Sequence, residues 1–413
     1  MKGNKKKLAI PILTSGVVLV AIATCIVLSI IIKKDDNAEP QQPEPVVVEP
    51  PKPKITNFSA KYLFVGTTFW GRNTNKSARA SELGVNYPFS KLDTLDRTSY
   101  QGWIGGLECP VTDNGHNYTE ENNIFKFNCD PDYLPAAAKY FSAFLLGNNH
   151  AGNQGLEGMR TTRKYLDENN IQYFGTPKRT AADPNDTEYA NDEADINNCS
   201  VVVLPVIATY DNSETKELKF PFGFCSAHGV YGVPGDDYLQ NIADYAKAIP
   251  TIAMPHMGVE YQKSHDTLRQ NLYRKIIDLG VESVIADHPH TVQDSEAYNG
   301  KLIVYSVGNF MFDQTFNAEV PRSAAIEGNV TISADSADLE KWNELGENCL
   351  KDKTTCFEKI TSAKLAKPTT TWNYNYHATT SAGDRIPRLA DEADQNSIGQ
   401  RLNWATTLAG LSN

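Results

Sequence analysis

The sequence lacks the features expected of a nucleic-acid-binding protein and of a structural zinc protein. Its formal net charge is -11, with 39 basic and 50 acidic residues, and the body of the chain carries no Lys/Arg-rich patch with interleaved aromatic residues. An acidic chain of this kind is not expected to bind nucleic acid through a basic surface. There is no C-x-x-C pair, so the cysteines do not indicate a structural zinc site.

One long apolar run lies near the start of the chain. Residues 8–32 form 25 residues without a charge, which at about 1.5 Å per residue suffices to cross a hydrocarbon core of about 30 Å. Four lysines precede the run, whereas the two lysines behind it are followed by two aspartates. The positive-inside rule then predicts a cytoplasmic tail at 1–7, a single transmembrane anchor at 8–32 and a body outside the membrane. A cleaved signal peptide ending near Ala23 is the alternative, although its apolar region is usually only about 7–15 residues long.

The rest of the chain divides into three parts by composition. Residues 33–57 are rich in proline and acidic residues and predict an extended, semi-stiff stalk. Residues 58–332 are predicted to form the main domain. Residues 333–413 show weaker periodicity and are predicted to be a C-terminal extension, either helices packed on the domain or a partly disordered tail.

Short apolar runs of strand length recur through the main domain. Two helical patterns lie between them, at 156–166 and 268–279, and Gly280 ends the second. Strands that alternate with helices predict a layered α/β domain. The six runs are 62–65, 141–146, 201–208, 252–254, 281–286 and 302–307.

Six cysteines follow the apolar run, and an even number outside a membrane permits three disulfides. Pairing of sequence neighbours is the simplest prediction, and six buried free thiols are the alternative. The neighbouring pairs are Cys109 with Cys129, Cys199 with Cys225, and Cys349 with Cys356.

Side chains capable of metal binding or acid–base chemistry follow almost every one of these strand-length runs. Ligands bind at the carboxyl ends of strands in open α/β sheets, where several loops converge. Histidine, carboxylate and amide groups suit Zn, Mn or Fe, so a centre for one of these divalent metals is predicted there. The clusters are 67–72, Glu108, 148–150, His256, 287–290, and Asn309 with Asp313.

Within these clusters, single residues admit competing interpretations. His288 and His290 are two apart, and in an extended backbone they would point to the same side. His150 is a candidate proton donor to a leaving group. Alternatively, Asn149 and His150 cap the helix that begins near residue 156, His256 is structural and Glu108 is a surface carboxylate.

The clusters resemble those of the CapA family of capsule and poly-γ-glutamate synthesis proteins, which are similar to calcineurin-type metallophosphatases. The resemblance covers about residues 61–332. It implies a four-layer α/β/β/α metallophosphatase-like sandwich, with His150 as general acid and Arg72 as a candidate for binding an anionic substrate. The implied metal ligands are Glu108, Asn149, His256, His288 and His290. The matching segments are 66–72, 107–112, 147–151, 256–261, 288–293 and 298–310.

The chain departs from the family pattern at four positions. Thr67 replaces an Asp, Gly106 an Asn, Met257 a Trp and Asp287 a His. A threonine hydroxyl is neutral and a poor substitute for a carboxylate ligand, so one metal position is predicted to be weakened. A single-metal site, or a site that only binds, is therefore weighed against a full two-metal centre.

Three functions follow as hypotheses. The first is a membrane-anchored, extracytoplasmic protein that takes part in synthesis, export or attachment of an anionic polymer such as capsule or poly-γ-glutamate. Its partners would be the polymer or its synthesis machinery and the membrane, with no nucleic acid. The alternatives are a metal-dependent hydrolase of phosphoester or amide bonds outside the membrane, and a binding module with a degenerate site.

Overall fold

The computed structural model describes residues 52–115, 126–175, 198–226, 228–230 and 232–411. These residues form a mixed α/β, sheet-rich fold, as the sequence predicts. Across these ranges no helix is both long and apolar enough to cross a membrane. The predicted anchor and most of the predicted stalk lie outside the described residues.

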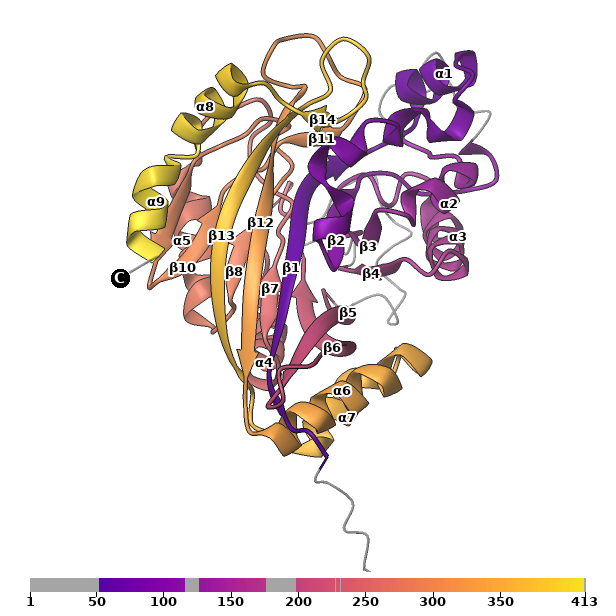
Figure 1. Cartoon of the computed structure of the whole chain (residues 1–413). Coiled ribbons are helices and arrows are strands. Elements are labelled where there is room, and N and C mark those ends of the chain that lie inside the picture. The colour runs from indigo at the N-terminus through magenta and orange to yellow at the C-terminus, as the bar shows by residue number, and fades with distance from the viewer. Residues whose placement is uncertain (1–51, 116–125, 176–197, 227, 231, 412–413) are drawn as a thin grey trace, which may run out of the picture. The chain divides into compact units, whose positions relative to one another are not determined.

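The long strand β1 (Ile55–Thr68) joins the parts of the sheet. It pairs antiparallel with β12 (Arg322–Ser333) and, near its start, with β5 (Cys199–Tyr210). Towards its end it pairs parallel with β2 (Gly102–Leu107) and with β11 (Asn309–Met311). The sheet therefore branches at β1, which lies beside β12 in Figure 1.

Parallel strands dominate the two branches that carry the polar clusters. On one branch, β2 pairs with β3 (Phe141–Leu145), which pairs with β4 (Gln172–Phe174). On the other, β5 and β6 form an antiparallel pair, and parallel strands follow β6. Their bounds are β6 (Thr215–Cys225), β7 (Thr251–Ala253), β8 (Ser283–Ile285) and β10 (Lys301–Val304), with β9 (Ser295–Tyr298) antiparallel at the edge.

Alternate side chains of β1 enter two different hydrophobic cores. Tyr62 and Phe64 belong to the larger core, whereas Leu63 and Val65 belong to the smaller one. Successive residues of a strand point to opposite faces, so β1 is buried on both sides. The larger core also includes side chains of α4 (Asp236–Ala248), α5 (Thr267–Asp278) and α6 (Ser336–Lys351), and the smaller includes those of α2 (Leu134–Ala137) and α3 (Gly155–Glu168).

The C-terminal part adds a full strand to the sheet. The strand β13 (Thr369–Thr380) pairs with β12 at twelve positions, from Arg322 with Thr380 to Ser333 with Thr369. The sequence did not predict this strand, since only helices or a disordered tail were considered there. The other elements are α7 (Cys356–Ala363), β14 (Arg388–Leu389), α8 (Glu392–Arg401) and α9 (Trp404–Leu411).

Most elements predicted from periodicity are confirmed. The six apolar runs overlap β1, β3, β5, β7, β8 and β10, and the two helical patterns overlap α3 and α5. The remaining elements are α1 (Arg72–Ala80) and the short 3-10 turns 84–89, 92–95, 97–99 and 131–133. The three disulfides join the sequence-neighbour cysteines, so that prediction is also confirmed and the alternative of free thiols is wrong.

Candidate metal centre

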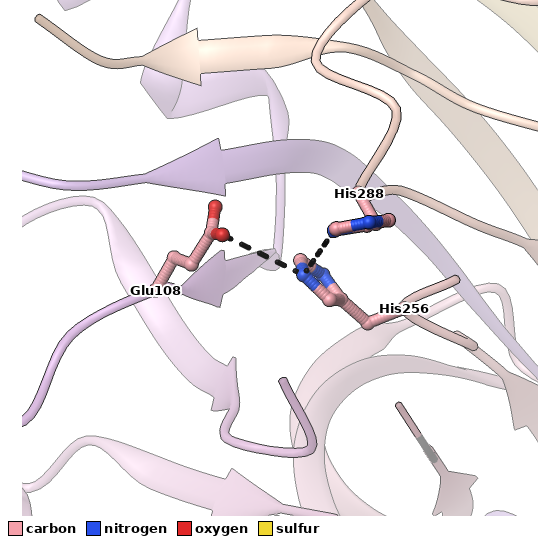
Figure 2. Close-up of side chains that lie close together, drawn as sticks. All are labelled: Glu108, His256 and His288. Atoms are coloured by element: carbon pink, nitrogen blue, oxygen red, sulfur yellow. Dashed lines mark hydrogen bonds and ion pairs between the residues drawn. The ribbon is translucent and has the colours of Figure 1, made fainter. Parts of the chain in front are cut away.

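Side chains from four separate strand ends meet at one point. Glu108 follows β2, Asn149 follows β3, His256 follows β7 and His288 follows β8. Figure 2 shows Glu108, His256 and His288 pointing toward one another, and one ligand atom from each lies within 4.8 Å of the others. The structure thus brings together residues that the sequence separates by up to 180 positions.

The distances around His256 fit a small coordination sphere. Its Nε2 lies 3.0 Å from Oδ1 of Asn149, 3.2 Å from Nδ1 of His288 and 3.6 Å from Oε1 of Glu108. Metal–ligand bonds of about 2.0–2.2 Å in a tetrahedron separate the ligand atoms by about 3.4 Å. These three atoms therefore lie about as far from Nε2 of His256 as the ligand atoms of one ion lie from one another.

Glu108 is a buried carboxylate at the middle of this group. Its exposed fraction is 1%, and neither oxygen has a hydrogen-bonding partner among the described residues. Burial alone would raise the pKa of Glu108, but the imidazoles of His290, His256 and His150 outweigh burial and lower it well below the usual range. A buried charge without hydrogen bonds is costly, and a bound cation would compensate this one.

Asp287 holds His256 from the opposite edge of the imidazole. The Nδ1 of His256 donates to Oδ1 of Asp287 at 2.7 Å. Burial alone would lower the pKa of His256, but Asp287 and Glu108 outweigh burial and raise it to about 10. At this pKa both ring nitrogens are protonated at neutral pH, so a metal ion would have to displace the proton on Nε2, while Asp287 keeps the one on Nδ1, as in the carboxylate–histidine–metal arrangement of many metal sites.

Three of the four departures from the family pattern meet around one carboxylate. The hydroxyl of Thr67 donates to Oδ2 of Asp287 at 3.4 Å. A Cβ atom on Gly106 would lie 2.6 Å from the same oxygen, so a larger residue there would displace this carboxylate. The chain thus has no carboxylate at position 67 but has one at position 287, where it accepts a hydrogen bond from His256.

His288 and His290 are held by a strained loop. Their φ angles are 100° and 58°, so the predicted extended backbone is wrong, although the ring centroids lie only 5.8 Å apart. Such angles cost about 1–3 kcal/mol each and cluster at functional sites. Burial, together with the charges of His256 and His290, lowers the pKa of His288 well below its usual value, which keeps a lone pair available. The Nδ1 of His290 donates to Oδ1 of Asn309 at 2.8 Å.

His150 lies at the side of this centre. Its Nε2 is 3.9 Å from Oε1 of Glu108, and its Nδ1 donates to Oδ1 of Asn153 at 2.8 Å. Burial lowers the pKa of His150, which favours the neutral ring with a lone pair on Nε2. The role of His150 as a proton donor stays a prediction.

The two remaining predictions concern Arg72 and helix capping. Arg72 pairs with Asp313 through both Nε, at 3.1 Å, and Nη2, and its guanidinium lies 4.5 Å from the Phe127 ring that stacks on His150. Its charge is thus matched by Asp313.

The capping interpretation of Asn149 is wrong, because the residue before α3 is Gln154 and carries no side-chain cap.

Sequence reasoning missed the roles of Asp287, Asn153 and Asn309. Each accepts a hydrogen bond from a histidine of the cluster and orients its ring. The sequence places Asn309 among the strand-end residues but indicates no role for it. A weak signal existed, since each lies within a few residues of a strand end or a histidine.

Comparisons with known proteins agree on one family. Residues 61–314 match the model of the family described as bacterial capsule synthesis protein PGA_cap. The PGA biosynthesis protein CapA of Bacillus subtilis (strain 168) is 24% identical over 267 residues, which cover 63% of this chain and 66% of that protein. The capsule biosynthesis protein CapA of Bacillus anthracis is 24% identical over 258 residues, or 60% of this chain and 59% of that protein. The match therefore spans less than two thirds of the length of either relative.

One solved structure is also similar in part. The protein TT1561 of Thermus thermophilus superposes with a TM-score of 0.31 and 10% identity, covering 64% of this chain and 92% of that one. A score this low carries no argument about fold or function.

Proposed function

This chain belongs to the family of bacterial capsule synthesis proteins, PGA_cap, and on that premise we propose that it takes part in synthesis, export or attachment of an anionic surface polymer. We propose further that this role depends on a divalent metal ion, Zn, Mn or Fe, held beside Glu108. The proposal extends to this chain what the names of its relatives state, namely capsule and PGA biosynthesis.

The observation that carries the metal centre is the buried, ionised Glu108 without a hydrogen bond among the described residues. Glu108, His256 and His288 would hold the ion, and the amide oxygen of Asn149 lies close enough to join them. All four are ligand types that these metals accept. A bound ion would supply a Lewis acid and would lower the pKa of a water molecule beside it.

The surrounding residues would prepare the centre for chemistry. Asp287 holds the proton on Nδ1 of His256, so that Nε2 is the nitrogen that would bind the ion after losing its own proton. Asn153 plays the same part for His150. His150 keeps 15% of its side chain exposed, which lets it exchange a proton with a substrate at the edge of the centre.

The location outside the membrane is part of the proposal. The apolar run 8–32 supports a single anchor that leaves the main domain outside. The three disulfides support an oxidising compartment, since disulfides are rare in the cytosol. The branching of the sheet at β1 and the two cores on its faces support the four-layer α/β/β/α arrangement.

Deletion and complementation test the proposed function. Cells without the gene should carry less surface polymer, and the wild-type gene should restore it. Glu108→Gln keeps the volume of the side chain but removes its charge, and should fail to restore the polymer. Glu214→Gln, at an exposed turn, is the matched control and should restore it fully. Unchanged surface polymer in the deletion strain would count against the proposal.

A metal-dependent hydrolase is the second candidate, favoured by the position of His150 beside Glu108. Purified protein supplied with Zn or Mn should then hydrolyse model phosphodiesters or γ-glutamyl amides. His150→Gln should lower kcat by about 100-fold or more while metal content is unchanged. No turnover with any of these ions would remove this candidate and leave a metal-binding role.

A further inference from the structure

A cleft of about 640 Å³ lies beside the candidate metal centre. Residues of the segment 259–266 and Arg269 line it. Tyr261 joins the cleft to the centre, because it lines the cleft and its ring stacks on His290 with centroids 5.7 Å apart. The proposed ligands of the metal ion do not line the cleft. Its volume lies within the range of about 300–1,000 Å³ that is usual for ligand sites.

A buried glutamine holds the wall of the cleft in place. Gln293 is fully buried, and its Nε2 donates to the carbonyls of Gln262 and Ser264 at 2.9 and 3.1 Å. Its Oε1 accepts a hydrogen bond from Nη1 of Arg269 at 3.1 Å. The hydroxyl of Thr291 donates to the same carbonyl of Gln262 at 2.7 Å. The cleft is therefore preformed, which lowers the entropic cost of binding a ligand.

His265 presents one ring nitrogen to this cleft. Its Nδ1 donates to the two oxygens of Asp294, at 2.9 and 2.8 Å, and its ring stacks on Tyr305 with centroids 3.7 Å apart. The Nε2 of His265 has no hydrogen-bonding partner among the described residues, and the side chain is partly exposed. Asp294 and Tyr305 thus fix the ring, and Nε2 is the nitrogen that a ligand can reach.

Lys263 supplies a cationic group at the same cleft. Its side chain is largely exposed, and its Nζ lies 3.3 Å from Oε1 of Glu319. Arg401 donates to the other oxygen of Glu319 at 2.6 Å, so two cations share this acid. The charge of Lys263 is therefore matched only in part, which favours an anionic ligand on a chain that is acidic as a whole.

The apolar surface of the cleft suits methylene groups. Val259 is exposed, and the ring of Tyr261 meets that of the exposed Phe316 with centroids 5.0 Å apart. Gln262 and Ser264 add side-chain amide and hydroxyl groups, which can hydrogen-bond to amides of a ligand. The cleft therefore combines apolar contacts with separate single charges.

The start of α5 disfavours a phosphate in this cleft. Helix N-termini commonly bind phosphate through their unpaired backbone N–H groups. Here Asp266 accepts a hydrogen bond from the backbone N–H of Arg269 at 2.9 Å, so a carboxylate of the chain itself occupies that position.

We propose that this cleft binds a polyamide chain that carries carboxylates, with His265 and Lys263 each binding one carboxylate and Tyr261 packing against methylene groups. This inference rests on the proposed function, because it identifies the segment of polymer that lies beside the metal centre. With Asp294 at Nδ1 and a carboxylate of the ligand at Nε2, the ring of His265 is protonated on both nitrogens and donates to both acids.

Fluorescence anisotropy of the full-length protein with a fluorescein-labelled γ-glutamyl oligomer of about ten residues tests the proposal. The wild type should bind this oligomer and should not bind the γ-glutaminyl oligomer of equal length, which lacks the carboxylates. His265→Phe keeps a ring against Tyr305 but should weaken binding by about tenfold, because a hydrogen bond to a charged group is lost. Lys263→Gln should weaken binding by about threefold, since an exposed ion pair contributes less.

Lys341→Gln is the matched control, because Lys341 is an exposed lysine of α6 whose Nζ lies 3.1 Å from Asp338. It should bind the oligomer as the wild type does. Wild-type affinity in both His265→Phe and Lys263→Gln would overturn the role of the cleft. Lys263 is exposed, so Lys263→Gln should keep the wild-type melting temperature and metal content even if His265→Phe folds poorly. Competition by millimolar inorganic phosphate would overturn the choice of carboxylates.

Surface polymer in cells separates this inference from the proposed function. If deletion lowers the polymer but the double variant of His265 and Lys263 restores it fully, the cleft has no part in the role and the proposed function stands. If deletion leaves the polymer unchanged while the purified protein still binds the oligomer through both residues, the proposed function fails and the cleft stands.

Discussion

At the residue scale, His256 is held at both edges of its ring. Asp287 binds Nδ1, and the donor atoms of the centre surround Nε2. The orientation of the ring therefore depends on a carboxylate that is not itself a ligand. Such outer partners typically change metal affinity by about 10- to 100-fold when they are removed.

Asp287→Asn should accordingly weaken the binding of the metal ion beside Glu108 by about 10- to 100-fold, because an amide oxygen still accepts the proton of His256 but carries no charge. Competition with a chromophoric chelator measures this change. Thr67→Val removes only the longer contact of 3.4 Å and is the matched control, with a smaller loss expected. Equal affinity of Asp287→Asn and wild type would contradict the role given to Asp287.

The positions of the ligand histidines could be predicted from the sequence, but their geometry could not. His256 and His288 follow buried apolar runs, which made the ends of the strands recognisable. The positive φ angles of His288, His290 and Tyr261 carry little signal in residue type, since none is glycine and only histidine is somewhat enriched there.

At the element scale, a buried acid joins three parts of the sheet. Glu282 precedes β8 and is 4% exposed. It binds Lys301 of β10 at 2.6 Å and Lys367 at 3.0 Å, and it accepts a hydrogen bond from Thr370 of β13 at 2.8 Å. Burial would raise the pKa of Glu282, but the two lysines lower it below the ordinary value of 4.5.

The sign of the pH dependence follows from this lowered pKa. The contribution of Glu282 to stability is complete above about 4.5, the pKa in the unfolded chain, and is lost as the pH falls through the folded value. Glu282→Gln should lower the free energy of unfolding by about 1–3 kcal/mol near neutral pH. Because the variant has no carboxyl group at this position, it should also lose less stability than the wild type as the pH falls below about 4.5.

Urea denaturation across the acid range measures both effects. The ion pair of the exposed Glu217 with Lys219 gives the control, since Glu217→Gln should change stability by less than about 1 kcal/mol. If Glu282→Gln and wild type lose stability in parallel as the pH falls, Glu282 does not act as described.

The strands that the sequence predicted best are those buried on both faces. Runs such as 252–254 and 284–286 are continuously apolar, because parallel strands in the interior meet side chains on either side. Strand β13 alternates Thr and Asn with Trp372, Tyr374 and Tyr376, so one face is polar. The sequence contains this alternation of period two, but every second residue is polar, so the segment does not form an apolar run of strand length.

At the scale of the whole molecule, three disulfides close loops around the domain. The pair of Cys109 with Cys129 spans 20 positions and lies next to Glu108, whereas that of Cys349 with Cys356 spans 7. A disulfide that closes a longer loop lowers the entropy of the unfolded chain more. The expected stabilisation is about 3 kcal/mol for the first disulfide and about 2 kcal/mol for the second.

Serine replacement of each pair tests this difference. The double variant of Cys109 and Cys129 should unfold at a lower urea concentration than the double variant of Cys349 and Cys356. It should also bind the metal ion beside Glu108 less tightly, because the disulfide next to Glu108 is lost. The double variant of Cys349 and Cys356 should keep the wild-type metal affinity. Equal losses of metal affinity in both variants would contradict the local role of the first disulfide.

Family and fold class could be predicted because motifs and strands recur in order along the main domain. The C-terminal part could not, since β13 owes its place to pairing with β12, from which it is separated by the helices α6 and α7. Such long-range pairing is decided by the complete sheet and is absent from local periodicity.

The central claim is that a divalent ion sits among Glu108, His256 and His288. An anomalous difference map from crystals of the full-length protein, recorded at the absorption edge of the added Zn or Mn, tests it most directly. We predict a peak within about 2.0–2.3 Å of Nε2 of His256 and of a carboxylate oxygen of Glu108. A map with no peak between these three side chains at saturating metal would contradict the account.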